Sequence, residues 1–338
     1  MKLNTVAIDL AKNSFYVVGF GANNKPLWRK KFNRKGFARF AVKHERSKMV
    51  MEACAGAHYW GRRFSEHGHE VELLPPQHVK AYLRGQKNDY NDAQAIGEAS
   101  IHGVIRPVAV KTVEQQDEQA FHRIRQQLKS EQTALINQLR GLLNEYGIVI
   151  PKGIAKAQQA IPEILEDADN GLTTSLRELL HRQYRRYQSL REEVDWYDRR
   201  LQQRAREDEV LQRLLEVPGL GPVNGSQLKA WLGDGKQFGC GRDASAAVGL
   251  VPRQHSTGGR ERLYGITKRG DASLRTAIIH GARAVVRRAK DKDDRLSRWV
   301  NQLVERRGFN KAVVALANKM VRIAWVLVHR QETYRQMV

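Results

Sequence analysis

One short apolar stretch at residues 5–12, with the sequence TVAIDLAK, constrains the fold of this chain more than any other. Three aliphatic residues lead directly into Asp9, and small and basic residues follow it. This pattern predicts a buried strand that ends in a carboxylate facing a cleft. Because a single acid at a strand end is often only a turn residue, the importance of Asp9 depends on companions elsewhere in the chain.

Three more acids occupy positions that would bring them to Asp9. Glu52 closes the apolar run MVME at residues 49–52, and Asp89 and Asp92 lie three apart at the start of a helical pattern. Side chains three apart on a helix lie about 5–6 Å apart at Cβ, so both can face one cleft. The helix dipole also favours acids in a first turn, which explains either aspartate alone but not all four acids. We therefore predict that the four bind a divalent metal ion together.

The first part of the chain, residues 1–112, alternates strand and helix patterns. Strands and helices are predicted, in chain order, at residues 6–8, 15–20, 27–32, 36–44 (helix), 49–52, 58–67 (helix) and 71–74. Three strands, helix, strand, helix, strand is the order of a ribonuclease-H-like mixed sheet in an α/β domain. In such a sheet the strands that end in Asp9 and Glu52 are neighbours.

The middle of the chain, residues 113–212, predicts an arm of two long helices. Apolar residues recur there at spacings of three and four, and a segment with proline and glycine interrupts them between residues 151 and 171. Such a pattern predicts an antiparallel helical hairpin or coiled coil. Its narrow apolar seam favours an arm that protrudes and associates with a second copy of the chain.

The last part, residues 213–338, predicts a small helical domain. The turn VPGLGP at residues 217–222 resembles a helix-hairpin-helix turn, in which Gly219 and Gly221 let backbone N–H groups approach a phosphate. An ordinary tight turn between two helices is the alternative. A polar, glycine-rich loop follows at residues 252–262, and a helix begins near residue 272.

Ser256, in the HSTGG segment of that loop, is the candidate nucleophile. A serine hydroxyl needs a base, a metal or a cationic site to stabilise its alkoxide. Cations close to it in the sequence would neutralise charge on a scissile phosphate. They are Arg253, Arg260, Arg262, Lys268, Arg269 and, on the following helix, Arg275. A Ser–Thr–Gly–Gly segment is also an ordinary turn, and Thr257 leaves the choice of hydroxyl open.

The net charge of the chain predicts a polyanionic partner. The formal charge is +22, and residues 251–338 hold 20 Lys and Arg against 7 Asp and Glu, a net +13 of that total. Charge of this size opposes compaction unless a polyanion shares it, so nucleic acid is the expected partner and the C-terminal quarter its main contact.

The cysteines and the apolar segments predict a cytoplasmic protein. Cys54 and Cys240 are far apart and have no second ligand pair, which excludes a zinc finger or a disulfide framework and fits a reducing compartment. The apolar stretch at residues 312–328 contains Lys319 and Arg322, so it predicts a buried helix rather than a membrane span.

Magnesium is the metal that the four acids favour. Mg²⁺ prefers oxygen ligands in octahedral geometry, and two such ions about 3.5–4 Å apart can bind both the attacking and the leaving oxygen of a phosphodiester. Zinc does not fit, because no Cys or His cluster accompanies the acids. The residues thus predict Mg²⁺ chemistry on nucleic-acid phosphodiesters.

Six segments together resemble one family. In chain order they are AIDLAK, MEACAGAHYW, KNDYNDAQAI, PGLGPVNGSQL, VGLVPRQHSTGG and ITKRGDASLRTAIIHGARAV. They resemble the DEDD transposases of bacterial insertion sequences, of the insertion-sequence 110 family and its 1111 subgroup, which are related to the Piv invertase. The resemblance runs almost end to end. It implies a RuvC-like catalytic domain at residues 1–112, a coiled-coil arm at 113–212 and a helical transposase domain at 213–338.

The resemblance also implies a mechanism and partners. The four acids of the family fall on Asp9, Glu52, Asp89 and Asp92, and its nucleophilic serine falls on Ser256. It implies recombination of double-stranded donor and target DNA through a phosphoserine intermediate, with Mg²⁺ on the acids. It further implies a dimer or tetramer in which the serine of one protomer works with the acids of another. A structured bridge RNA would pair with both DNAs, so that base pairing reads the sequence.

Three other functions fit parts of the pattern. A RuvC-like junction nuclease would use metal-activated water in place of serine. A non-catalytic nucleic-acid-binding assembly protein would use the acidic cleft only structurally. A sugar-kinase-like ATPase begins with a similar strand, but the sequence has no second phosphate loop of the expected kind.

Overall fold

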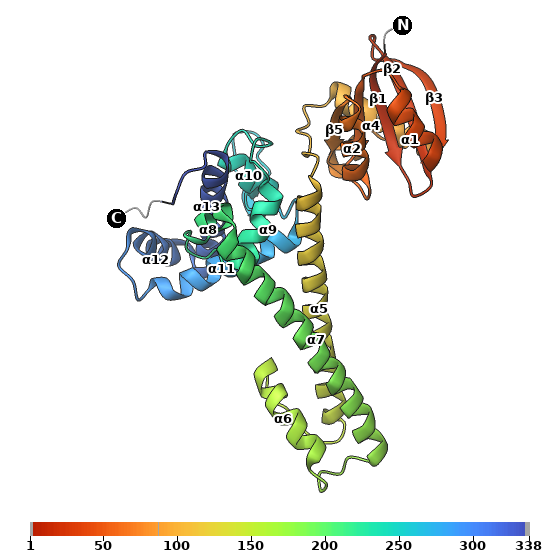
Figure 1. Ribbon diagram of the computed structural model, residues 1–338. Helices are drawn as coiled ribbons and strands as arrows, with labels where there is room; N and C mark the ends of the chain where they lie inside the picture. Colours follow the sequence, from red (N-terminus) through yellow and green to blue (C-terminus); the bar gives the residue numbers. More distant parts are fainter. Residues whose placement is uncertain (1–2, 87, 335–338) are drawn as a thin grey trace. The chain divides into compact units, whose positions relative to one another are not determined.

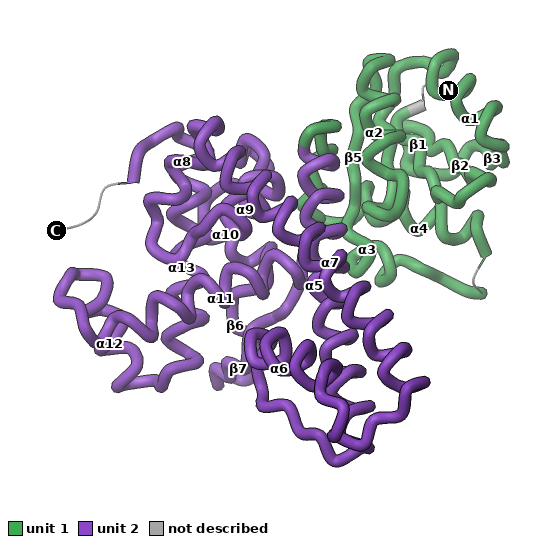
Figure 2. The backbone as a smooth tube through the Cα atoms, turned by 60° about the horizontal axis from the view of Figure 1, so that its bottom comes forward, with its two compact units in different colours: residues 1–114 green, residues 115–338 purple. Residues whose placement is uncertain are grey.

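The computed structural model describes residues 3–86 and 88–334 (Figure 1). The chain forms two compact units, residues 1–114 and residues 115–338 (Figure 2). The three-domain division expected from the sequence places its first boundary close to this one. Its second boundary falls inside the second unit and stays a prediction.

Unit 1 is built on a five-stranded mixed sheet in the order β3-β2-β1-β4-β5. β1, β2 and β3 pair antiparallel, whereas β1 pairs parallel with β4, and β4 parallel with β5. The strands are β1 (Leu3–Leu10), β2 (Ser14–Gly21), β3 (Pro26–Asn33), β4 (Lys48–Glu52) and β5 (Glu70–Leu74). All five predicted strands are therefore present, in the arrangement of a ribonuclease-H-like domain.

Helices cover both faces of this sheet. α1 (Arg34–Lys43) and α2 (Ala57–Glu66) pack on a cluster that includes Ile8, Phe37 and Trp60. α4 (Asp89–His102) packs on the opposite face, and α3 (Pro76–Val79) and a 3-10 turn, Lys80–Tyr82, precede it. Alternate residues of β1 thus enter different cores, as a buried strand requires.

α4 packs closely against the sheet. A Cβ added at Gly97 would overlap the ring of Phe20 and touch the side chain of Ala7. The missing side chain at this one position lets the helix rest directly on β1 and β2. The first turn of α4 is thereby held beside the end of β1.

Two long helices run side by side: α5 (Val113–Asn144), which begins at the end of unit 1 and lies almost wholly in unit 2, and α7 (Thr174–Glu207) (Figure 1). The buried residues Leu180, Tyr187, Val194 and Leu201 of α7 recur every seven positions. This spacing is that of a heptad seam. Association of the arm with a second copy stays a prediction.

The segment between these helices differs from the turn that the sequence predicts, because it contains a further helix, α6 (Ile154–Glu166). Ala157, Ile161 and Leu165 bury its inner face in the core of the arm. Pro162 has no N–H for the carbonyl of Gln158, and the hydroxyl of Tyr184 donates to that carbonyl instead, at 3.2 Å. Tertiary packing therefore overrides the helix-breaking signal.

The rest of unit 2 packs around one apolar core. Its elements are α8 (Glu209–Leu215), α9 (Pro222–Leu232), α10 (Gly241–Ala247), β6 (Pro252–Gln254), β7 (Leu263–Ile266), α11 (Ala272–Ala289), α12 (Arg295–Arg307) and α13 (Phe309–His329). α13 is long and apolar enough to cross a membrane, but half of its most apolar window is buried inside this core.

The VPGLGP turn before α9 is used for packing and capping. A Cβ at Gly219 would lie 2.9 Å from the Met320 side chain and 3.0 Å from the carbonyl oxygen of Gly281. The N–H of Gly221 donates to the side chain of Asn224, at 2.6 Å. The turn therefore packs tightly against α11, and the phosphate-binding role expected for Gly219 and Gly221 stays a prediction.

A buried polar cluster joins α5, α7 and α9. The Glu118 carboxylate accepts hydrogen bonds from the Ser226 hydroxyl and the Arg204 guanidinium, and the His122 ring lies 2.7 Å from that hydroxyl. Burial opposes ionisation of Glu118, but the bonds from His122 and Ser226 and the charge of Arg204 outweigh it and lower its pKa to about 2. The ionised carboxylate therefore holds the three helices together.

Glu118→Gln should lower the free energy of unfolding of unit 2 by about 2–3 kcal/mol at pH 7, because the amide cannot replace the charge-assisted bonds. A carboxylate whose pKa falls on folding stabilises the protein above its unfolded pKa, so the difference should shrink as the pH falls from 4.5 towards about 2. Urea unfolding monitored by circular dichroism at several pH values measures the loss of stability and its pH dependence.

The matched control is Glu178→Gln, which changes an exposed acid on α7. It should alter stability by less than about 0.5 kcal/mol. Equal effects of the two substitutions at pH 7 would contradict this role for Glu118.

Candidate metal centre and serine hairpin

Parallel pairing of β1 and β4 fixes the positions of the first two acids, Asp9 and Glu52. Ile8 is in register with Met51, so Asp9 and Glu52 follow at the ends of adjacent strands. The amide of Ala53 bonds to the carbonyl of Leu74, at 2.8 Å, which ties the exit of β4 to β5. Both carboxylates are partly buried at the same edge of the sheet.

The N-terminus of α4 fixes the positions of the other two acids, Asp89 and Asp92. Asn88 caps the helix by accepting a hydrogen bond from the amide of Asn91, at 2.9 Å, and the Asn91 side chain donates to the carbonyl of Gln86. Asp89 and Asp92 lie in the first turn that this cap fixes. The close approach at Gly97 then holds that turn against β1.

Asp9, Asp89 and Asp92 each offer a carboxylate oxygen, and these oxygens lie within 4.8 Å of one another. Oxygen ligands of one Mg²⁺ ion sit at about 2.1 Å from it, so they are about 3–4 Å apart in an octahedral shell. The oxygen Oδ1 of Asp92 is buried, and no group in the described part of the chain donates to it. A buried acceptor of this kind is costly unless a cation or a water satisfies it. The three aspartates therefore fit a hard divalent cation.

Glu52 lies outside that three-residue group, but the charge of one of its members affects the pKa of Glu52. Burial raises the pKa of Glu52, and the negative charge of Asp92 raises it further. The pKa of the Cys54 thiol is raised by burial and then by the charges of Glu52 and Asp9. Glu52 is thus close enough to Asp92 to be affected by its charge, and its part in binding the metal stays a prediction.

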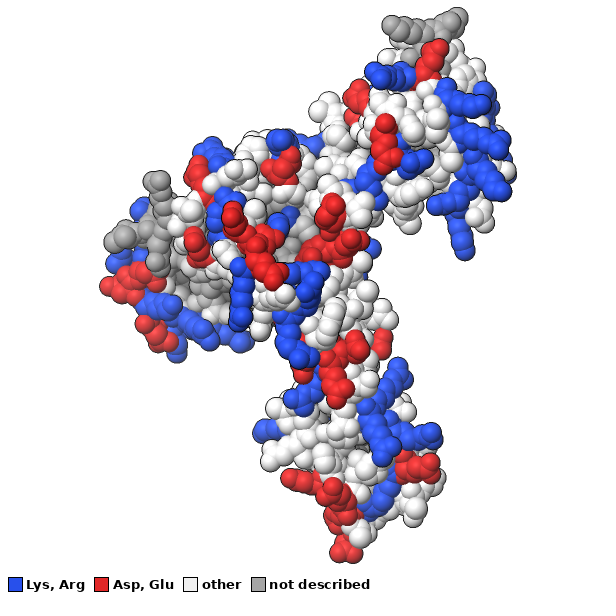
Figure 3. Space-filling view, viewed as in Figure 1, with Lys and Arg blue, Asp and Glu red and all other residues white. Residues whose placement is uncertain are grey.

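Lys31 and two tyrosines flank this cluster, and sequence patterns gave no signal for them. Tyr16 on β2 is in register with Asp9, and its ring packs edge-on against Tyr90, 5.0 Å between centroids. A hydrogen bond to Tyr16 raises the pKa of Lys31, and the charge of Asp89 adds to the effect. Figure 3 shows Lys and Arg gathered over the β3 side of unit 1.

The serine lies on a β-hairpin in unit 2. β6 and β7 pair antiparallel, and Gly258 and Gly259 both have positive φ, as a tight hairpin turn requires. The Ser256 hydroxyl is exposed, and its oxygen accepts hydrogen bonds from the side chain of Gln254, at 3.0 Å, and the amide of Arg262, at 3.4 Å. These bonds hold the hydroxyl near the tip.

The cations expected around Ser256 divide into two groups. Five are exposed on or just after the hairpin: Arg253, Arg260, Arg262, Lys268 and Arg269. Arg275 does not lie at the surface, where direct contact with nucleic acid would require it to be. It is 8% exposed, and its guanidinium donates to the carbonyls of Val248 and Arg269. Its guanidinium fixes the end of the hairpin segment from inside.

Comparison with known proteins identifies the family. A DEDD transposase model of the IS110 type matches residues 6–148, and the model "Transposase IS116/IS110/IS902 family" matches residues 211–297. The chain belongs to this transposase family. The first matched region contains the four acids, and the second contains the serine hairpin.

Relatives of the family match over nearly the whole chain. The transposase of insertion sequence IS1111A from Coxiella burnetii is 43% identical over 98% of this chain and 92% of its own length. A probable family 20 transposase from Pseudomonas aeruginosa is 43% identical over 99% of both chains. The IS1328 transposase of Yersinia enterocolitica is 40% identical over 95% of this chain and 96% of its own.

Asp92→Asn should have opposite effects without and with metal. Without metal it should raise the stability of unit 1 by about 1 kcal/mol, because it removes one of several crowded negative charges. The gain in melting temperature that millimolar Mg²⁺ gives the unaltered protein should be lost. Differential scanning calorimetry with EDTA and then with Mg²⁺ measures both effects.

Glu70→Gln is the control, because it removes an exposed acid at the start of β5, the opposite end of the sheet. It should leave the Mg²⁺ response unchanged. An Asp92→Asn protein that responds to Mg²⁺ as strongly as this control would show that the aspartates do not bind the ion.

Proposed function

We propose that this transposase cuts and rejoins DNA with Ser256 as nucleophile and Asp9, Glu52, Asp89 and Asp92 as ligands of Mg²⁺. The observation that carries the proposal is the convergence of Asp9, Asp89 and Asp92 from two distant parts of the sequence onto oxygens within 4.8 Å of one another. A family that transposes DNA gives such a cluster a phosphodiester to act on. Mg²⁺ bound there would neutralise charge that develops on the phosphate oxygens.

The serine step is a transesterification. The Ser256 oxygen bonds to the scissile phosphorus as the bond from phosphorus to a sugar oxygen breaks, and the serine proton ends on that sugar oxygen. A sugar hydroxyl of the second DNA then attacks the phosphoserine and frees the serine. Arg253, Arg260 and Arg262 lie exposed on the same hairpin, where they can neutralise the phosphate during both steps.

The catalytic unit is proposed to be an oligomer. Ser256 and the four acids lie in different compact units of the chain. The family resemblance implies a dimer or tetramer in which the serine of one protomer serves the acids of another. The two long helices α5 and α7 are the proposed arm for this association.

Sequence specificity is proposed to come from a guide RNA. The resemblance implies a bridge RNA that pairs with donor and target DNA, while the protein holds the backbones. A net charge of +22 suits a protein that holds several nucleic-acid strands at once. Sequencing RNA that copurifies with the protein tests this part, since one defined element-derived RNA is expected and a mixture of cellular RNAs would contradict it.

The chemistry is tested by trapping the protein on labelled DNA. The unaltered protein with Mg²⁺ should form a covalent DNA adduct that survives denaturing electrophoresis. Ser256→Ala should reduce that adduct by at least about a thousandfold, as expected for loss of a nucleophile. Thr257→Ala, which removes the neighbouring hydroxyl, should retain it.

Two outcomes would favour other functions. Strand cleavage retained by Ser256→Ala would indicate a junction nuclease that uses water. Full recombination by Asp9→Asn would indicate that the acidic cluster has only a structural role.

A further inference from the structure

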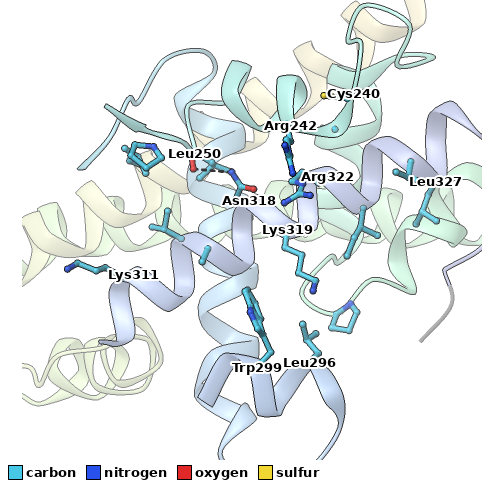
Figure 4. Close-up of a pocket in the computed structure, with 18 of the residues that line it drawn as sticks. Cys240, Arg242, Leu250, Leu296, Trp299, Lys311, Asn318, Lys319, Arg322 and Leu327 are labelled. Carbon is cyan, nitrogen blue, oxygen red and sulfur yellow. Dashed lines mark hydrogen bonds between the residues drawn. The ribbon is translucent and has the colours of Figure 1, made fainter. Parts of the chain in front are cut away.

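A cavity of about 1700 Å³ lies in unit 2 between the β6–β7 hairpin, α10, α12 and α13 (Figure 4). This volume exceeds the roughly 300–1,000 Å³ of ordinary small-molecule pockets, so the cavity is sized for a longer ligand. Apolar side chains of α12 and α13, among them Leu296, Val314 and Ile323, form part of its lining. Pro252 and four residues of β7 line it from the hairpin side.

The charged residues of the lining are mostly cations. Among the described residues, six Lys or Arg and two Asp or Glu line the cavity: Arg242, Lys268, Arg295, Lys311, Lys319, Arg322, Asp294 and Glu332. Both acids have partners within the protein. Asp294 caps α12 by accepting hydrogen bonds from Ser297, and Glu332 forms an ion pair with Arg330, at 3.8 Å. The cavity therefore presents an excess of positive charge to a ligand.

Two of these cations are placed side by side. Arg242 on α10 and Arg322 on α13 extend toward each other, and no carboxylate of the described residues forms an ion pair with either (Figure 4). Gly241 makes this possible, since a Cβ there would lie 2.9 Å from the carbonyl oxygen of Arg322. Two unneutralised guanidinium groups held together by close backbone packing form a site for a phosphate, which accepts paired N–H donors.

Aromatic rings complete the lining. Trp299 faces the cavity from α12, with the ammonium of Lys319 4.8 Å from the centre of its ring, and Tyr264 lines the hairpin side. Aromatic rings beside cations are the usual features of proteins that bind unpaired nucleic-acid strands, because bases stack on the rings while phosphates contact the cations.

The cavity is also joined directly to the serine hairpin. The Asn318 amide donates to the carbonyl of Leu250, at 3.2 Å, and to the hydroxyl of Ser245, at 3.1 Å. These bonds anchor the chain just before β6 begins. A ligand in the cavity therefore lies against the base of the hairpin that carries Ser256.

We propose that this cavity binds a short unpaired segment of a nucleic-acid strand, with a phosphate on Arg242 and Arg322 and a base against Trp299. The inference rests on the proposed function, because a strand held here would flank the phosphate that Ser256 attacks. A neutral apolar ligand would make no contact that uses the two guanidinium groups. A small anion would leave the apolar volume and the aromatic rings unused.

The test compares two double variants of the full chain in EDTA, with fluorescent oligothymidylate as the probe at one fixed salt concentration. R242Q/R322Q should weaken binding of this single-stranded probe by about tenfold, while binding of a duplex of equal length changes much less. R306Q/R307Q is the control, since it removes the same charge from exposed positions of α12 outside the cavity. It should weaken single-strand binding less than twofold, which is the effect expected from the loss of surface charge alone.

Photocrosslinking gives the location independently. A strand containing 5-bromouracil should crosslink to the tryptic peptide of residues 299–306, which begins with Trp299. Equal losses of binding in the two double variants, or crosslinks confined to peptides away from the cavity, would overturn the proposal. So would a cavity covered by a second copy of the chain, seen as oligomers that R242Q/R322Q dissociates.

The outcome is separable from that of the serine chemistry. Strand binding in EDTA needs neither metal nor a nucleophile, so Ser256→Ala protein should bind the probe normally. Normal binding by R242Q/R322Q together with loss of the DNA adduct in Ser256→Ala would refute the cavity proposal and leave the proposed function standing.

Discussion

Crowding of negative charge at one edge of the sheet is the constraint on which the rest of unit 1 depends. Asp9, Asp89 and Asp92 repel one another at oxygen distances within 4.8 Å, and Glu52 is close enough for Asp92 to raise its pKa. Parallel pairing of β1 with β4 and the close packing of α4 on the sheet hold these groups together against that repulsion. A divalent cation bound among these groups would relieve that repulsion.

The strand pattern of unit 1 could be predicted from sequence because each strand is short, apolar and followed by a turn. The strand order predicts that the strands ending in Asp9 and Glu52 are neighbours, and the observed pairing of Ile8 with Met51 supplies the register. Tyr16 and Lys31 could not be found in this way. Pairing of β1 with β2 places Tyr16 beside Asp9, and pairing of β2 with β3 places Lys31 beside Tyr16. Cross-strand neighbours of this kind leave no local signal.

In unit 2, tertiary packing decides the structure at several places where the local sequence predicts something else. Pro162 predicts a break, yet α6 continues through it because Tyr184 supplies the hydrogen bond that proline cannot. Arg275 looks like a phosphate contact in the sequence, yet its guanidinium is used by two backbone carbonyls. The large cavity under the hairpin is likewise a product of tertiary structure, since its lining comes from segments far apart in the chain.

Anomalous diffraction from crystals grown with Mn²⁺, which takes the same oxygen ligands as Mg²⁺, would show whether the four acids bind a divalent metal. We expect a strong anomalous peak within about 2.0–2.3 Å of carboxylate oxygens from Asp9, Asp89 and Asp92, with Glu52 in contact directly or through water. Well-ordered carboxylates with no peak among them, or Mn²⁺ bound only elsewhere on the chain, would contradict this expectation.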